Sequence, residues 1–96
     1  MNRVLFLEGA RAEAIDAFRW YEEQRPGLGR VFRSALGAAI ARIRRNPLAY
    51  PELRREMRRS LVDRFPYIIL YRVVEDVIVI VGVVHGRRSP RRWQQR

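Results

Sequence analysis

The chain has 96 residues, which leaves room for one domain around one hydrophobic core. Hydrophobic residues make up 48% of it, too many for a disordered basic tail, and the absence of cysteine excludes disulfide and thiolate chemistry. The formal net charge is +10, and all 20 basic residues are arginine, which binds phosphate or carboxylate through paired hydrogen bonds. This charge predicts an acidic partner: nucleic acid, the ribosome or an acidic protein segment.

The apolar run near the first residue stops at Glu8, which is too short for an export signal or a membrane span. We therefore expect a single domain over residues 1–96, in the cytoplasm and without membrane contact. The sequence has no phosphate-binding glycine loop and no cluster of metal ligands, so neither a cofactor nor a metal is expected.

Two helices are predicted after a short strand over residues 3–7. Alanine, phenylalanine and tyrosine recur at helical spacing from residue 10 to residue 21, and Pro26-Gly27 ends this first helix. The second helix covers residues 28–45, has a cleaner apolar stripe, and ends at Asn46-Pro47. Because so few residues join the helices, they must form an antiparallel hairpin.

The rest of the chain predicts strands over residues 55–62, 65–73 and 77–84, after a loop over 48–53. Tyr67, Ile69 and Tyr71 share one face of the second of these strands, and Glu75-Asp76 makes a hairpin turn. Residues 77–84 are apolar on both sides, as in a central strand, and we expect the first strand beside them. The predicted fold is α+β, with the order strand, helix, helix and three strands, and with the helical hairpin on one face of a mainly antiparallel sheet.

Two arginine clusters are candidate surfaces for nucleic acid or a target protein. One comprises Arg54, Arg55, Arg58 and Arg59, and the other lies in a basic C-terminal tail, residues 86–96, with Arg87, Arg88, Arg91 and Arg92. We expect neighbouring strands to bring both clusters to one edge of the sheet, where they could bind phosphate. Alternatively, the strand arginines lie in solvent and only prevent edge pairing.

Some of these residues could also form a catalytic site. His85 is the only histidine and ends the last predicted strand, so it could act as acid or base, with Arg59 and Arg88 on a phosphate and Tyr71 orienting it. A single histidine at the end of a strand is more often structural.

Several motifs together resemble the RelE/ParE toxins of type II toxin–antitoxin systems. The segment from Trp20 to Gly29, followed by Asn46-Pro47 and Tyr50-Pro51, is similar to their helical hairpin. Arg58-Arg59, Phe65-Pro66-Tyr67, Tyr71-Arg72-Val73 and the ending His85-x-Arg-Arg-x-Pro-x-x-Trp93 continue the match in order over nearly the whole chain.

This resemblance implies a toxin that a cognate antitoxin neutralises with an acidic or amphipathic segment. Operator DNA would be bound only through the antitoxin. The expected antitoxin contacts are Val79, Val81, Val83, Arg88 and Trp93. The long hairpin and the His-x-Arg-Arg-x-Pro ending look more like the ParE, or plasmid stabilisation, branch, which implies inhibition of DNA gyrase. The alternatives are a RelE-like endoribonuclease that cuts mRNA on the ribosome, and a basic nucleic-acid-binding module without toxicity.

Overall fold

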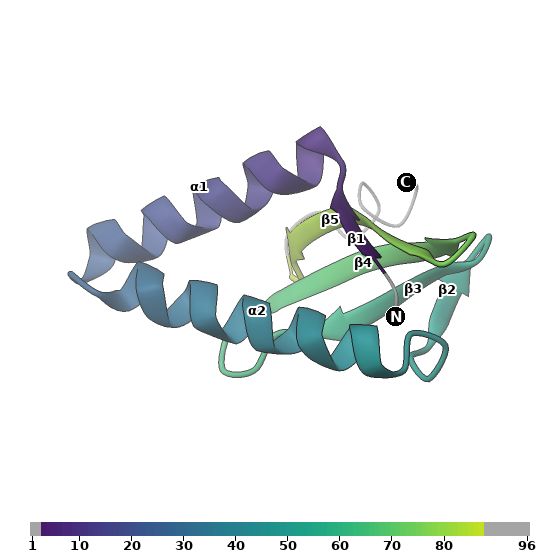
Figure 1. Cartoon of the computed structure of the whole chain (residues 1–96). Helices are drawn as coiled ribbons and strands as arrows, with labels where there is room; N and C mark the ends of the chain where they lie inside the picture. Colours follow the sequence, from purple (N-terminus) through teal and green to yellow (C-terminus); the bar gives the residue numbers. More distant parts are fainter. Residues whose placement is uncertain (1–2, 88–96) are drawn as a thin grey trace.

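The computed structural model describes residues 3–87, in which two helices lie on one face of a five-stranded sheet (Figure 1). The strand order is β1-β5-β4-β3-β2; β1 is parallel to β5 and every other neighbouring pair is antiparallel. The elements are β1 (Arg3–Phe6), α1 (Glu8–Gln24), α2 (Leu28–Arg45), β2 (Glu52–Arg54), β3 (Met57–Leu61), β4 (Tyr67–Val74) and β5 (Val77–His85). The predicted α+β class, the helical hairpin and the pairing of the first strand with the last are confirmed.

The turn between the helices is fixed by a carboxylate of α1. Glu22 accepts hydrogen bonds from the backbone amides of Gly27, at 2.9 Å, and Gly29, at 3.0 Å. These amides belong to the start of α2, where they have no partner within the helix and where the helix dipole favours a negative charge. A Cβ atom at Gly29 would lie 2.7 Å from the carbonyl oxygen of Phe18, so glycine is required for this close approach. The hairpin therefore ends in a tight turn, which projects beyond the strands (Figure 1).

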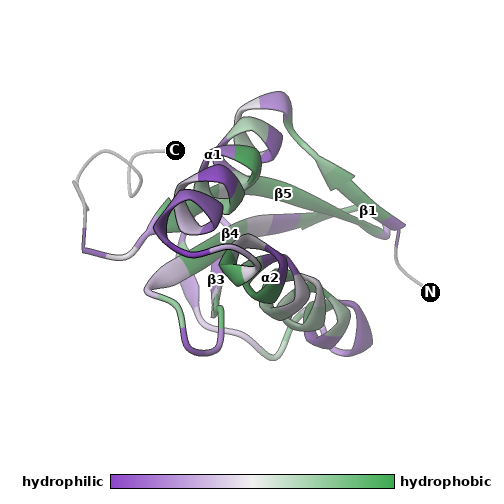
Figure 2. Ribbon diagram, turned by 90° about the vertical axis from the view of Figure 1, so that its left-hand side faces the viewer, coloured by the Kyte–Doolittle hydropathy of each residue, from purple (hydrophilic) through white to green (hydrophobic). Residues whose placement is uncertain are grey.

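The main core lies between the helices and the sheet. Helix α2 contributes its stripe of Phe32, Leu36, Ala39 and Ile43, while α1 contributes small residues that let it approach β5 closely. Every second residue of β4 from Tyr67 faces this core, as the alternation of the strand predicts. Figure 2 shows β5 as hydrophobic along its length and the outer sides of the helices as largely hydrophilic.

A second, smaller apolar cluster occupies the other face of the sheet. It comprises Met57, Ile68, Leu70 and Val84, with Leu53 and Val81 packed against it. This cluster explains why β5 is apolar on both sides. Strand β5 is an interior strand between β1 and β4, as predicted, while β4 lies in the middle of the five strands and is the most completely buried of them.

The short edge strand β2 was predicted as loop. It pairs with β3 through a turn in which Arg55 and Glu56 both have positive φ, at 48° and 63°. Such a turn suits the twist of a two-residue hairpin, but its usual residues are Asn and Gly, so Arg55-Glu56 carries no local signal for it. The turn also shortens the predicted strand 55–62, which begins only at Met57.

Glu13 of α1 completes the hydrogen bonding of β5. Strand β1 ends at Phe6, opposite Ile80, and a bulge at Val81 then shifts the pairing of β5 with β4. Beyond that point β5 has no strand on its outer side. The amide of Val83 instead donates a 3.0 Å hydrogen bond to the Glu13 carboxylate, so a side chain of α1 replaces the missing strand.

We expect Glu13→Ala to lower the free energy of unfolding by about 2 kcal/mol, because it leaves the buried Val83 amide without its charged acceptor. Glu13→Gln keeps a carbonyl acceptor and should cost clearly less. Urea unfolding followed by circular dichroism measures both variants. Equal stability of Glu13→Ala and the parent chain would contradict this role.

Candidate binding and catalytic surfaces

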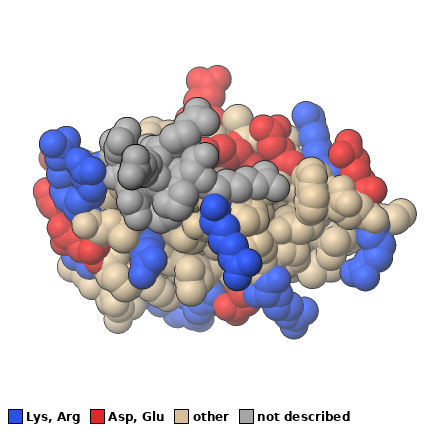
Figure 3. Space-filling model, turned by 180° about the vertical axis from the view of Figure 1, so that it is seen from behind, with Lys and Arg blue, Asp and Glu red and all other residues tan. Residues whose placement is uncertain are grey.

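The described residues place Arg87 apart from the first predicted basic cluster. Arg54 and Arg55 lie at the turn between β2 and β3, at the end of the sheet where β5 begins, whereas Arg87 follows the other end of β5. Arg87 therefore does not lie beside Arg54 and Arg55, and the meeting of the remaining arginines of the two clusters at one edge stays a prediction. Where Figure 3 shows described residues on the far side of the sheet, the arginines stand apart from one another, with neutral and acidic surface between them. Arg88, Arg91 and Arg92 lie outside the described residues.

Arg58 and Arg59, although adjacent, have different surroundings. The Arg58 guanidinium donates to the carbonyl oxygens of Tyr50, at 2.7 Å, and Leu48, at 3.3 Å, and lies 3.8 Å from the Glu52 carboxylate. It thus fastens the loop after α2 to the sheet. Arg59 is exposed and pairs in register with Leu70, which places it on the sheet face opposite the helices.

Tyr71 is fully buried on the helix side of β4. Its hydroxyl donates a 2.6 Å hydrogen bond to the carbonyl oxygen of Pro47, just after α2. Burial raises the pKa of Tyr71 to about 12, and the nearby positive charge of Arg58 offsets only part of that effect. The phenol is therefore protonated near neutral pH and joins α2 to the sheet.

His85, at the end of β5, has contacts that hold it in place. Its Nδ1 atom accepts a 3.2 Å hydrogen bond from the Arg87 amide, and its ring packs edge-on against Tyr67, with 5.4 Å between ring centres. Because Tyr71 pairs with Ile80, it lies five residues along β5 from His85, roughly 15 Å at the rise of a strand. Tyr71 and Arg59 lie on opposite faces of the sheet. The structure thus does not bring His85, Tyr71 and Arg59 together, and Arg88 is outside the described residues.

The residues predicted to contact an antitoxin differ in burial and in the face of the sheet on which they lie. Val83 is 1% exposed and belongs to the core beneath the helices, so a partner cannot reach its side chain. Val79 and Val81 are half-buried, and Val79 pairs with Arg72 on the far face. Trp93, like Arg88, lies outside the described residues.

An apolar groove between the helices was not predicted. Its volume is about 410 Å³, and Phe6, Phe18, Phe32 and Leu36 line it, flanked by Arg11 and Arg33. The Arg33 guanidinium stacks over the Phe18 ring, 5.2 Å from its centre. Nearby along the chain, Leu5, Leu7 and Ile15 are 52%, 43% and 43% exposed. The alternation of Leu5 and Leu7 outside the core was the available signal, but it required knowing that β1 is an edge strand.

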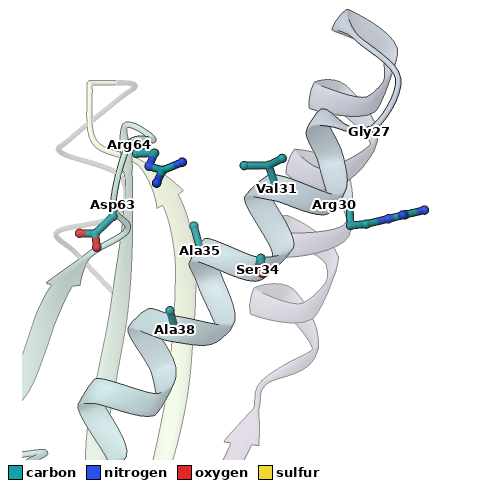
Figure 4. A pocket seen from close by; sticks show the side chains of 8 residues that line it. All are labelled: Gly27, Arg30, Val31, Ser34, Ala35, Ala38, Asp63 and Arg64. Atoms are coloured by element: carbon teal, nitrogen blue, oxygen red, sulfur yellow. The ribbon is translucent and has the colours of Figure 1, made fainter.

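A second open cavity lies on the other flank of α2, facing the turn between β3 and β4 (Figure 4). Its volume is about 540 Å³; Val31, Ala35 and Ala38 point toward Asp63 and Arg64 across it, and Arg30 extends away.

Within residues 3–87, no group of three His, Asp or Glu side chains is placed to hold a metal ion. Neither described helix combines the length and apolarity needed to cross a membrane.

Comparisons with known proteins agree with this architecture. Residues 4–90 match the family model of the ParE toxin of the type II toxin–antitoxin system parDE. Toxin ParE2 from two strains of Mycobacterium tuberculosis, CDC 1551 / Oshkosh and H37Rv, is 28% identical over 90 residues, covering 93% of this chain and 86% of the relative. A solved structure described as the chromosomal ParDE TA system from P. aeruginosa superposes with a TM-score of 0.77 at 13% identity, covering 88% of this chain and 96% of that chain.

The structural likeness, at so low an identity, establishes the fold: a helical hairpin on a five-stranded mixed sheet. The family model spans most of the sequence, and the chain therefore belongs to the ParE toxin family of type II toxin–antitoxin systems. This confirms the predicted resemblance.

The raised pKa of Tyr71 predicts a stability change at alkaline pH. Above about pH 10 the unfolded chain ionises this phenol while the folded chain keeps it neutral. The stabilisation is therefore complete below pH 10 and is lost as the pH rises toward 12, by about 2 kcal/mol. Tyr71→Phe should remove this dependence and cost about 1 kcal/mol at neutral pH through the lost hydrogen bond. Urea unfolding at several pH values compares the two chains; parallel pH profiles would contradict the assignment.

Proposed function

We propose that this ParE-family chain is a growth-arresting toxin that acts by binding and inhibiting DNA gyrase, and that a cognate antitoxin neutralises it. One observation carries the choice of binding over RNA cleavage. The described residues that could cleave RNA are dispersed: Tyr71 is buried against Pro47, Arg59 is on the opposite face, and His85 is at a distant strand end. General acid–base catalysis needs these groups within hydrogen-bond reach of one phosphate. Gyrase as the target follows from the family resemblance.

For the antitoxin, we propose that it covers the apolar surface formed by the outer edge of β1 and the groove between the helices. Edge strands with exposed apolar side chains are templates for pairing with another chain. Here Leu5 and Leu7 are exposed on the edge, and Ile15 borders the groove. Arg11 and Arg33 flank the groove, so an amphipathic segment with acidic residues on its polar side is complementary to it. Val79 and Val81 remain predicted contacts on the far face.

The target is tested with purified chain and two assays. We expect it to inhibit supercoiling by gyrase at concentrations that leave ribosome-bound mRNA intact. His85→Ala should retain at least about half of this inhibition, because inhibition by binding needs no acid or base from this histidine. Cleavage of ribosome-bound mRNA that His85→Ala abolishes would instead identify a RelE-like endoribonuclease. Harmless expression together with salt-sensitive RNA binding would favour a non-toxic module.

The antitoxin surface is tested by Ile15→Asp, which adds a negative charge beside the groove and removes an apolar contact. We expect the affinity for the cognate antitoxin to fall by about tenfold or more, measured by calorimetry, because a like charge then faces an acidic partner. Val74→Asp is the matched control, since Val74 is 49% exposed at the end of β4, with β5 between it and β1, and does not line the groove. Equal losses in the two variants would contradict the proposed surface.

A further inference from the structure

A groove follows the flank of α2 that faces β3. The cavity in Figure 4 occupies its first part, along residues 27–38 of α2. A smaller cavity of about 350 Å³ continues the groove beside β3; it is lined by Arg42, Tyr50, Arg59, Ser60 and Leu61. Asp63 lines both. We call the two cavities together the α2–β3 groove; it shares no lining residue with the groove between the helices that is proposed for the antitoxin.

Backbone groups of β3 are open to this groove. Strand β2 pairs with β3 only from Met57 to Arg58, and the Arg59 amide bonds outward to the carbonyl oxygen of Pro51 at 3.1 Å. Because strand amides alternate in direction, the Leu61 amide points to the same outer side, past the end of β2. Pro51 has no N–H group to continue a ladder. The edge of β3 beyond Arg59 thus lacks a neighbouring strand and can pair with an extended chain.

Ser60 is a buried polar side chain that lines the groove without a partner. It is 4% exposed and is the only buried polar residue among residues 3–87. Within that range its hydroxyl has no hydrogen bond to another group. Because Ser60 lines an open cavity, its hydroxyl can donate to a group that enters the cavity. A ligand atom in the groove could accept this hydrogen bond.

The charges of the groove favour an anionic ligand. Arg42 and Arg64 line it, and Arg59 borders it at the edge of β3 although its side chain starts from the opposite face, against Asp63 as the acidic residue. The Arg42 Nη1 atom lies 3.6 Å from the Asp63 carboxylate, whose side chain is 74% exposed, whereas that of Arg42 is 33% exposed. Such an exposed ion pair is weak. A ligand carboxylate can therefore replace Asp63 at Arg42 and also accept a hydrogen bond from Ser60.

We propose that the α2–β3 groove binds an extended acidic segment of a partner protein, with its main chain along the edge of β3 and a carboxylate between Arg42 and Ser60. The small side chains of Ala35 and Ala38 leave room for a peptide backbone. A nucleic-acid strand fits less well, because stacking platforms are needed for its bases and the one aromatic residue lining the groove, Tyr50, is half-buried. The proposal holds whichever target the toxin inhibits.

The test is an NMR titration of the full chain with an acetylated and amidated hexapeptide of alternating valine and glutamate. We expect the Leu61 amide to shift, and a glutamine version of the peptide to bind more weakly. Arg42→Gln should weaken binding by about fivefold or more, because it removes the charged donor. Asp63→Asn should strengthen binding, by about twofold or more, because it removes the competing carboxylate. Arg44→Gln, an exposed arginine of the same helix outside the groove, is the control and should bind as the parent does.

Ser60→Ala distinguishes a binding role from a structural one. It should weaken peptide binding while leaving the melting temperature unchanged or higher, because a hydroxyl without a partner gives the free chain no stability. A lower melting temperature would show that the hydroxyl supports the fold, and would overturn the carboxylate site. The proposal also fails if Leu61 does not shift or if Asp63→Asn weakens binding. Displacement of the peptide by oligo-deoxythymidine with the same variant pattern would identify a nucleic-acid groove instead.

Discussion

The fold depends on the hydrogen bond between the Glu13 carboxylate and the Val83 amide. This bond provides an acceptor for β5 beyond the point where the shorter strand β1 ends. Strand β1 has four residues and β5 has nine, so more than half of β5 would otherwise have an empty outer edge. By occupying that edge, α1 is fixed above β5, and the position of the whole helical hairpin follows. Nine residues further along α1, the Glu22 carboxylate does the same for the free amides of α2. One helix thus supplies both of the acceptors that its neighbours lack.

The order of the elements could be read from the sequence because the strongest local signals agree. Pro26-Gly27 and Pro47 end the helices, and the alternation of Tyr67, Ile69 and Tyr71 correctly placed these side chains on one face. Strand β2 could not be predicted, since three residues are too few to show a period and the turn at Arg55-Glu56 uses positive φ without glycine or asparagine. The role of Glu13 was equally hidden, because a contact between residues 13 and 83 leaves no local pattern.

The candidate site was harder to predict than the fold, for a related reason. Alternation shows which residues share a face, but not which face the helices cover, and this decides that Tyr71 is buried while Arg59 is exposed. The arginine content alone also suggested that these side chains serve to bind an acidic partner. Arg58 holds the loop after α2 through two carbonyl oxygens, Arg33 covers an aromatic ring, and Arg42 pairs with Asp63. Part of the high positive charge therefore serves the internal structure, and a binding surface has to be located residue by residue.

The parallel pairing of β1 with β5 has a consequence for biosynthesis. Arg3 pairs with Val77, so the first strand finds its neighbour only after nearly the whole chain has left the ribosome. Contacts between residues so far apart in sequence also slow folding, since a long loop must close before they form. A nascent or truncated chain without β5 lacks the partner of β1, β4 and Glu13 alike. The toxin can therefore complete its sheet only after translation has passed the last strand.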